Sequence, residues 1–213
     1  AGTHPMADLR ASHGFPEPLG VDFWELDNEL HRWFEAEDYA WAAVVYSRAM
    51  KAVDPSIKIG LSAYGERPDG SDYHRDMEKM LEIAGHDIDF LADRGDADAM
   101  TRQMIGKVKK FNAANGTDIK YCDTEWLAYN TENKRDQYNM AAKGEVTKSY
   151  AFSKWMYAMN LLKNFMGFQR MGDEMLFVNF NNLANTHRQC AMDTPKEGAY
   201  LTASGRALEL LSH

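Results

Sequence analysis

The chain has 213 residues, a length that suits one large domain or two small ones. Asp and Glu number 32 against 24 Lys and Arg, and the resulting formal net charge of −8 argues against nucleic acid and anionic membranes as partners. Hydrophobic residues at 45% and charged residues at 26% are ordinary for a folded globular protein and argue against a disordered chain.

The sequence indicates neither a membrane-spanning helix nor a metal centre. No apolar run approaches the roughly 20 residues that cross a bilayer. The two cysteines, Cys122 and Cys190, cannot form a disulfide framework, and no close Cys/His spacing is typical of zinc. We therefore expect no metal and no cofactor. The chain starts at Ala1 with neither Met nor a signal-peptide pattern, so its compartment, cytoplasmic or secreted, stays open.

Five short apolar runs predict strands, and helical patterns separate them. The predicted strands are, in chain order, Val21–Leu26, Ile57–Ser62, Ile88–Ala92, Ile119–Thr124 and Met175–Phe180. The predicted helices are Tyr39–Val53, Asp72–Ala84 before Gly85, Ala97–Ala114 before Asn115-Gly116, Val146–Phe165 before Gly167, and Ala199–Leu211. Strands that alternate with helices of this length predict right-handed crossovers and a parallel sheet.

The spacing of these strands suits two kinds of fold. A (β/α)8 barrel has about 31 residues per unit, and the first four predicted strands start 31 to 36 residues apart. An open, doubly wound sheet gives similar steps, but its nucleotide sites carry a Gly-rich turn, and neither G-x-G-x-x-G nor G-x-x-x-x-G-K-[ST] is present. Acidic and aromatic residues follow the strands instead, which favours a barrel.

Two glutamates follow predicted strands at a spacing that suits one cleft. The first strand leads into Asp27-Asn28-Glu29, and the fourth ends in Asp123-Thr124-Glu125-Trp126. The active sites of barrels lie at the C-terminal ends of their strands. Glu29 and Glu125 are 96 residues apart, which is three units of 32, so both carboxylates can line one cleft from opposing walls.

Glycoside hydrolysis needs such a pair of carboxyl groups. One is protonated and helps the leaving oxygen depart, and the other is ionised and attacks the anomeric carbon. Asn28 can hydrogen-bond a sugar hydroxyl, and Trp126 can pack on a sugar face. Either glutamate alone is more often a helix N-terminal residue or a solvated loop charge. Together, with Asn28 and Trp126 beside them, they favour catalysis.

Further motifs extend the pattern around these two glutamates. They are the segment Ala7–Pro18 before the FWELDNE block, the helix Ser149–Phe165 and residues 180–186. Together with Asn28-Glu29 and Glu125-Trp126 they resemble glycoside hydrolase family 51, chiefly α-L-arabinofuranosidases of the retaining (β/α)8 clan. The resemblance implies that Glu29 is the acid/base at the end of strand four and Glu125 the nucleophile at the end of strand seven. It also implies that Gln189, after strand eight, binds substrate.

The sequence departs from the family pattern at two places. The family commonly has Tyr after strand six, in contact with the nucleophile, whereas this chain reads Leu91-Ala92-Asp93-Arg94-Gly95. Either Arg94 plays a different role, or that contact is missing. The nucleophile strand reads Asp-Thr-Glu-Trp, where Asp-Glu-Trp-Asn is commoner in the family, so one residue separates Asp123 from Glu125.

One weaker candidate follows the second predicted strand. Tyr64, with Glu66 and Arg67, can line the cleft, and we expect Tyr64 to bind substrate. An ordinary surface loop is the alternative.

The resemblance implies an α/β fold that is the C-terminal portion, about strands four to eight, of a (β/α)8 barrel, with residues 1–213 as one partial catalytic domain. We expect the chain to be part of a longer enzyme, and these residues alone to be inactive because both sheet edges are open. The implied activity is that of a retaining, non-reducing-end α-L-arabinofuranosidase acting on arabinose-containing side chains of plant polysaccharides. An endo-β-glucanase or xylanase of the same clan, or a non-catalytic carbohydrate-binding remnant of a barrel, is the alternative. Homo-oligomerisation stays open.

Overall fold

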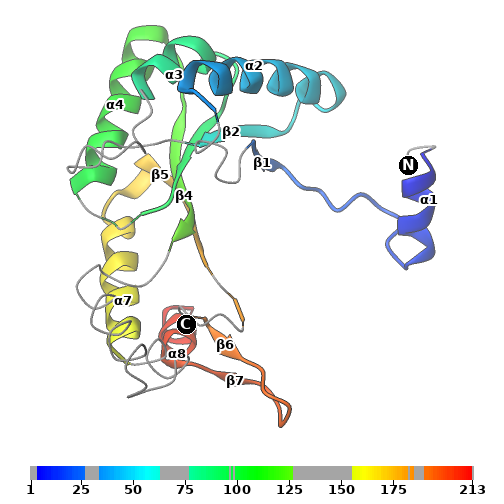
Figure 1. The fold of residues 1–213 in the computed structure, drawn as a ribbon, viewed down its shortest axis with the longest axis vertical. Coiled ribbons are helices and arrows are strands. Elements are labelled where there is room, and N and C mark those ends of the chain that lie inside the picture. The colour runs from blue at the N-terminus through cyan, green and yellow to red at the C-terminus, as the bar shows by residue number, and fades with distance from the viewer. Residues whose placement is uncertain are drawn as a thin grey trace.

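The chain folds around one parallel β-sheet whose five strands follow chain order (Figure 1). The computed structural model describes residues 4–26, 34–62, 77–95, 97, 99–126, 155–181, 183–184 and 190–212. The strands of this sheet are β1 (Phe23–Glu25), β2 (Lys58–Ser62), β3 (Phe90–Asp93), β4 (Lys120–Trp126) and β5 (Met175–Phe180). Because every neighbouring pair is parallel, the carboxyl ends of all five strands lie at one edge of the sheet.

Helices connect the strands, and most of them pack along one face of the sheet (Figure 1). The helices are α1 (Pro5–Ser12), α2 (Ala36–Val53), α3 (Met77–Ala84), α4 (Ala99–Asn115), α7 (Trp155–Gln169) and α8 (Ala203–Leu211). The short 3-10 helix η2 (Gly172–Glu174) precedes β5, and an antiparallel pair, β6 (Met192–Asp193) and β7 (Tyr200–Leu201), precedes α8. Helix α1 has no buried residue and lies apart from the sheet at the end of an extended stretch (Figure 1). None of the helices in the described ranges is long and apolar enough to cross a membrane.

The main hydrophobic core lies between the sheet and its helices. Strand side chains in it include Leu61, Leu91, Tyr121 and Trp126, and helix side chains include Met80, Leu81, Met104 and Leu161. In α3 the buried positions are Met77, Met80, Leu81 and Ala84. Steps of three and one residues place these positions on one face of a helix, which is why the sequence pattern predicts this element.

A smaller aromatic cluster covers the opposite face of the sheet. Its buried members are Phe90, Ala92 and Cys122. The Phe177 ring lies 5.4 Å from the Phe23 ring and 5.8 Å from the Phe90 ring, both edge-on. Gly60 of β2 makes room for this packing, since a Cβ atom there would lie 1.9 Å from a carbon of the Phe90 ring. Burial, followed by the nearby Glu25 carboxyl group, raises the pKa of the Cys122 thiol, so Cys122 is a neutral filler of this cluster.

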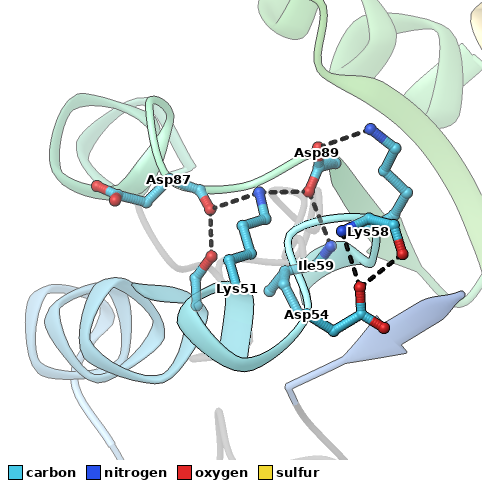
Figure 2. Close-up of polar contacts among 8 residues, drawn as sticks. Lys51, Asp54, Lys58, Ile59, Asp87 and Asp89 are labelled. Atoms are coloured by element: carbon cyan, nitrogen blue, oxygen red, sulfur yellow. Dashed lines mark hydrogen bonds and ion pairs between the residues drawn. The ribbon is translucent and has the colours of Figure 1, made fainter. Parts of the chain in front are cut away.

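The amino-terminal edge of the sheet is held by a network of charged side chains around Asp89 (Figure 2). Lys51 of α2 places its Nζ 2.6 Å from Asp89 Oδ2, and Lys58 of β2 places its Nζ 3.4 Å from Asp89 Oδ1. The Ile59 amide donates to Asp89 Oδ2 at 2.9 Å. Asp89, the residue directly before β3, therefore joins this strand to α2 and β2. This edge is opposite to the one at which Asp123-Thr124-Glu125 stands.

The predicted order of strands and helices is confirmed, and several boundaries are corrected. All five predicted strands form, and each of their bounds lies within two residues of the expected one. Gly116, with a φ of +68°, ends α4 as expected. Gly167, however, does not end a helix, because α7 continues through it to Gln169. A Cβ atom at Gly167 would lie 2.5 Å from Ala97 Cβ, so this glycine allows a close approach between two segments.

The last predicted helix begins later than expected. Tyr200–Leu201 forms β7, and α8 starts at Ala203, where the Thr202 hydroxyl caps the helix by accepting from the Gly205 amide at 3.2 Å. Helix α1 and the β6–β7 pair were not predicted. The expected helix starts at Asp72 and Val146 lie outside the described residues.

Candidate functional site

Glu125 stands at the carboxyl end of β4, and both of its carboxylate oxygens are engaged. Asn181, directly after β5, donates from Nδ2 to Glu125 Oε1 at 2.8 Å. Arg94, directly after β3, places Nε 3.3 Å from Glu125 Oε2. The Glu125 side chain nevertheless stays 33% exposed, so a molecule in solution can reach a carboxylate that is already oriented.

The strand geometry around Glu125 is irregular. The pairing of β4 with β5 shifts register between Tyr121 and Asp123 and again between Asp123 and Trp126. Irregular pairing of this kind turns side chains away from the regular alternation and is frequent beside functional sites. The backbone N–H of Asn181 donates to the backbone carbonyl of Trp126 at 2.9 Å, which ties the end of β4 to the residue after β5.

Arg94 contacts the candidate nucleophile at the position where the sequence pattern left two alternatives open. Its backbone amide donates to Asp93 Oδ1 at 2.7 Å. Tyr121 donates from its hydroxyl to Asp93 Oδ2 at 2.6 Å. Burial first, and then Asp93, raises the pKa of Tyr121 well above its ordinary value, so the phenol stays protonated and donates. Arg94 thus has a defined backbone position and a contact with Glu125.

Trp126 is placed in the core. Its side chain is 1% exposed, and its ring meets Phe168 and Phe180 edge-on at centroid distances of 5.5 Å each. The face of this indole, which the sequence pattern offered to a sugar, is covered by aromatic side chains in this structure. Trp126 therefore anchors the end of β4 against the helix layer and the neighbouring strand.

Four expected site residues lie outside the described part of the chain. Asn28 and Glu29 belong to residues 27–33, Tyr64 to residues 63–76 and Gln189 to residues 185–189. The structure does describe the strands that lead to two of these segments. β1 leads to Glu29 and β2 leads to Tyr64, and both end at the same edge of the sheet as β4. β1 and β4 stand three strands apart, as the spacing of 96 residues predicts.

The chain matches one family model, described as the alpha-L-arabinofuranosidase 1 domain, over residues 1–116. This range is more than half of the 213 residues. The chain belongs to this family.

Individual relatives agree with the family model. Over 92 residues the chain is 35% identical to the intracellular exo-alpha-(1->5)-L-arabinofuranosidase 1 of Bacillus subtilis, and the match covers 40% of this chain and 18% of that protein. The arabinose complex of the alpha-L-arabinofuranosidase of Thermotoga maritima superposes with a TM-score of 0.68 at 25% identity, over 98% of this chain and 43% of that one. The GH51 alpha-L-arabinofuranosidase of Thermotoga petrophila has a TM-score of 0.71 at 24% identity, over 100% of this chain and 44% of that one.

Two conclusions follow from these matches. The resemblance to glycoside hydrolase family 51 is confirmed, and the curled five-stranded sheet is part of a (β/α)8 barrel. The chain spans less than half the length of these solved arabinofuranosidases and less than a fifth of the length of the Bacillus relative.

Sequence reasoning assigned no role to Asn181, Asp123 or Tyr121. Asn181 could have been noticed because it is the first polar residue after an apolar strand, at the edge where Glu125 stands. Asp123 stands two residues before Glu125 on the same strand, a spacing that allows its side chain to reach the Glu125 amide. The hydrogen bond from Tyr121 to Asp93 joins residues that are 28 positions apart, and no local pattern announces it.

Proposed function

We propose that the whole protein is a retaining glycoside hydrolase that removes terminal α-L-arabinofuranosyl groups from the side chains of plant polysaccharides. The observation that supports this most is the Glu125 carboxylate at the carboxyl end of β4, oriented through both oxygens by Asn181 and Arg94 and still a third exposed. In a barrel of the arabinofuranosidase family, this is a position from which a carboxylate can attack a bound sugar.

The proposed reaction has two steps. In the first, a Glu125 oxygen attacks the anomeric carbon while the glycosidic bond breaks, and Glu29 gives its proton to the leaving oxygen. In the second, Glu29 takes a proton from water, the water oxygen bonds to the anomeric carbon, and the bond to Glu125 breaks. Arg94 and Asn181 hold the Glu125 carboxylate throughout. Asn28, Tyr64 and Gln189 are proposed to bind sugar hydroxyls.

The substrate and the stereochemistry are tested on the full-length protein. Aryl α-L-arabinofuranoside, β-xyloside and β-glucoside are compared, and we expect turnover of the arabinofuranoside to exceed that of the other two. Proton NMR of the first product should show the same anomeric configuration as the substrate. Preferred cleavage of the xyloside or the glucoside would contradict the substrate, and the opposite configuration would contradict the mechanism.

The two carboxylate roles are separated by variants. Glu29→Ala should still form the glycosyl-enzyme with an activated aryl substrate, and azide should restore turnover with retained configuration. Glu125→Ala should form no covalent intermediate. Glu174→Ala is the matched control, because Glu174 lies at the opposite edge of the sheet in an exposed pair with Lys109 and should leave turnover unchanged. Labelling of Glu29 by a fluoro-sugar that traps the nucleophile would reverse the assignment.

The activity is proposed for the whole protein, because the two outermost strands of the described sheet are each paired on one side only. β1 and β5 are its outermost strands, and Phe23 and Trp24 of β1 are 45% and 43% exposed. Unpaired strand edges and exposed apolar side chains favour association. We expect residues 1–213 alone to aggregate and to lack turnover, as judged by gel filtration and the aryl arabinofuranoside assay. A soluble monomer that turns over substrate would contradict this expectation.

A further inference from the structure

Asp123 is buried beside the candidate site. Asp123 is 2% exposed, and among the described residues no other Asp or Glu is buried. A carboxylate in such a place is costly unless hydrogen bonds satisfy it. The partners of Asp123 therefore indicate why it is there.

The two carboxylate oxygens of Asp123 accept hydrogen bonds from two backbone amides, one in the segment after β3 and one in β4. Asp123 Oδ2 accepts from the Gly95 amide at 2.8 Å, and Asp123 Oδ1 accepts from the Glu125 amide at 3.2 Å. Gly95 directly follows Arg94, and Arg94 contacts the Glu125 carboxylate at 3.3 Å. One buried carboxylate thus fixes the backbone next to Arg94 and the backbone of Glu125, the two ends of the ion pair.

Asp93 supports the same arrangement from the other side of Arg94. It accepts from the Arg94 amide at 2.7 Å and from the Tyr121 hydroxyl at 2.6 Å. The backbone before and after the Arg94 side chain is therefore held by Asp93 and Asp123, and the side chain between them is only 19% exposed. Its guanidinium group has little freedom to leave Glu125.

We propose that Asp123 is a positioning residue that aligns Arg94 with Glu125, so that the Glu125 carboxylate is oriented before substrate arrives. This inference rests on the proposed role of Glu125. Asp123 acts through the hydrogen bonds that it accepts from the Gly95 and Glu125 backbone amides. A misplacement of a reacting group by about 1 Å can lower a rate on the order of 100-fold, so loss of this alignment should reduce turnover strongly.

Asp123→Asn tests the inference in the full-length protein with an aryl α-L-arabinofuranoside. The asparagine keeps the shape but has only one accepting oxygen, so its NH₂ group faces one of the two backbone N–H donors. We expect kcat to fall about 10- to 100-fold with KM within about threefold of wild type. A smaller amount of folded enzyme would also lower the apparent kcat without changing KM. Active-site titration therefore corrects kcat for the concentration of active enzyme.

Asp89→Asn is the matched control. Asp89 also accepts a backbone amide, that of Ile59 at 2.9 Å, but it lies at the amino-terminal edge of the same sheet. We expect this variant to lose stability and to keep the wild-type kcat. If Asp123→Asn behaved in the same way, with lowered stability and unchanged kcat, Asp123 would be a purely structural residue and the inference would be overturned.

A double-mutant cycle tests whether Asp123 acts through Arg94. Arg94→Ala should lower kcat by itself, and the double variant Asp123→Asn, Arg94→Ala should lose no more than about twofold beyond Arg94→Ala. Losses that multiply would overturn the coupling.

The Gly95 variants test the same hydrogen bond if Asp123→Asn does not fold. Gly95→Pro removes the backbone N–H that donates to Asp123 Oδ2, and Gly95→Ala retains it. A Cβ atom at Gly95 has room among the described residues, where the nearest atom beyond its chain neighbours is Thr101 Oγ1 at 4.0 Å. We expect reduced kcat only for the proline variant, and equal kcat for both variants would overturn the inference.

Glu125→Ala separates this inference from the proposed function. If wild type is active, Glu125→Ala is inactive and Asp123→Asn is as active as wild type, the positioning role fails while the proposed function stands. If wild type is inactive, or Glu125→Ala retains activity, the proposed function fails and the positioning role fails with it.

Discussion

Replacement of Asp89 should destabilise the protein by an amount that the contacts in Figure 2 allow us to estimate. Asp89→Asn keeps one oxygen for the Ile59 amide but removes the charge that Lys51 and Lys58 bind. The Lys58 side chain is 51% exposed, and its ion pair with Asp89 contributes about 0–1 kcal/mol. The Lys51 side chain is only 30% exposed and lies closer to Asp89, so its ion pair contributes more. We expect a loss of about 1–2 kcal/mol in the free energy of unfolding.

Asp89→Ala should cost more than Asp89→Asn. It also leaves the Ile59 amide without its acceptor in a residue that is 0% exposed, and a buried donor without a partner costs about 1–3 kcal/mol. The total is then about 2–5 kcal/mol. In a chain of 150–250 residues 1 kcal/mol corresponds to about 2–4 °C in Tm, and in a longer chain to less, so Asp89→Asn should lower the Tm of the full-length protein by at most about 8 °C. Thermal and urea unfolding of the full-length variants, followed by circular dichroism, provide the measurement.

The pH dependence of this loss gives a second test. Burial raises the pKa of Asp89, but the hydrogen bonds from Lys51 and the Ile59 amide and the charges of Lys51 and Lys58 outweigh it, so the pKa lies below its ordinary value. A lowered pKa in the folded state stabilises the protein above the unfolded pKa of about 3.9, and this stabilisation is lost as pH falls through the folded pKa. The difference between wild type and Asp89→Asn should therefore be full at pH 6–7 and shrink below about pH 4. A difference that stayed constant down to pH 3, or no difference at neutral pH, would refute the reasoning.

Three further predictions concern distance and packing. In a crystal structure of the full-length protein the carboxyl groups of Glu29 and Glu125 should lie about 5–5.5 Å apart, and a separation of about 6.5–9.5 Å would indicate inversion. Trp126→Ala should lower the free energy of unfolding by about 3–5 kcal/mol, measured by urea unfolding, because its ring is fully buried; a change under 1 kcal/mol would contradict the core placement. Gly205→Ala should lower the free energy of unfolding by about 1–3 kcal/mol, since the added Cβ would lie 1.9 Å from a backbone oxygen. Gly106→Ala in α4 is the control, because its Cβ meets open space, and it should be neutral or stabilising by up to about 1 kcal/mol. Equal thermal shifts in the two variants would show that the close contact at Gly205 has no effect.

The sheet could be predicted from the sequence because its strands are buried and its helices are amphipathic. Ile59, Leu61, Phe90 and Leu91 form continuous apolar runs, which is typical of parallel strands covered on both faces. Gly167 was misread because a glycine near the end of a helical pattern has two physical uses, to end the helix or to admit a neighbour, and only the contact with Ala97 distinguishes them.

The candidate site could be predicted only in part. The position of Glu125 follows from one local rule, that catalytic groups stand at the carboxyl ends of barrel strands. Its partners do not follow from such a rule, since Arg94 and Asn181 lie 31 and 56 residues away and meet it only after the sheet forms. Trp126 shows the opposite case, in which an aromatic residue beside a catalytic candidate is required by the core.

The contact between Gly60 and Phe90 has a consequence for how relatives of this chain can vary. The missing side chain on β2 and the large ring on β3 fill one space, so neither position is free to change alone. A methyl group at Gly60 requires a smaller residue at Phe90, and a smaller residue at Phe90 leaves a void that a methyl group at Gly60 fills in part. Relatives that carry alanine or a larger residue at the first position should therefore carry an aliphatic residue at the second, so that the two sites substitute as a pair.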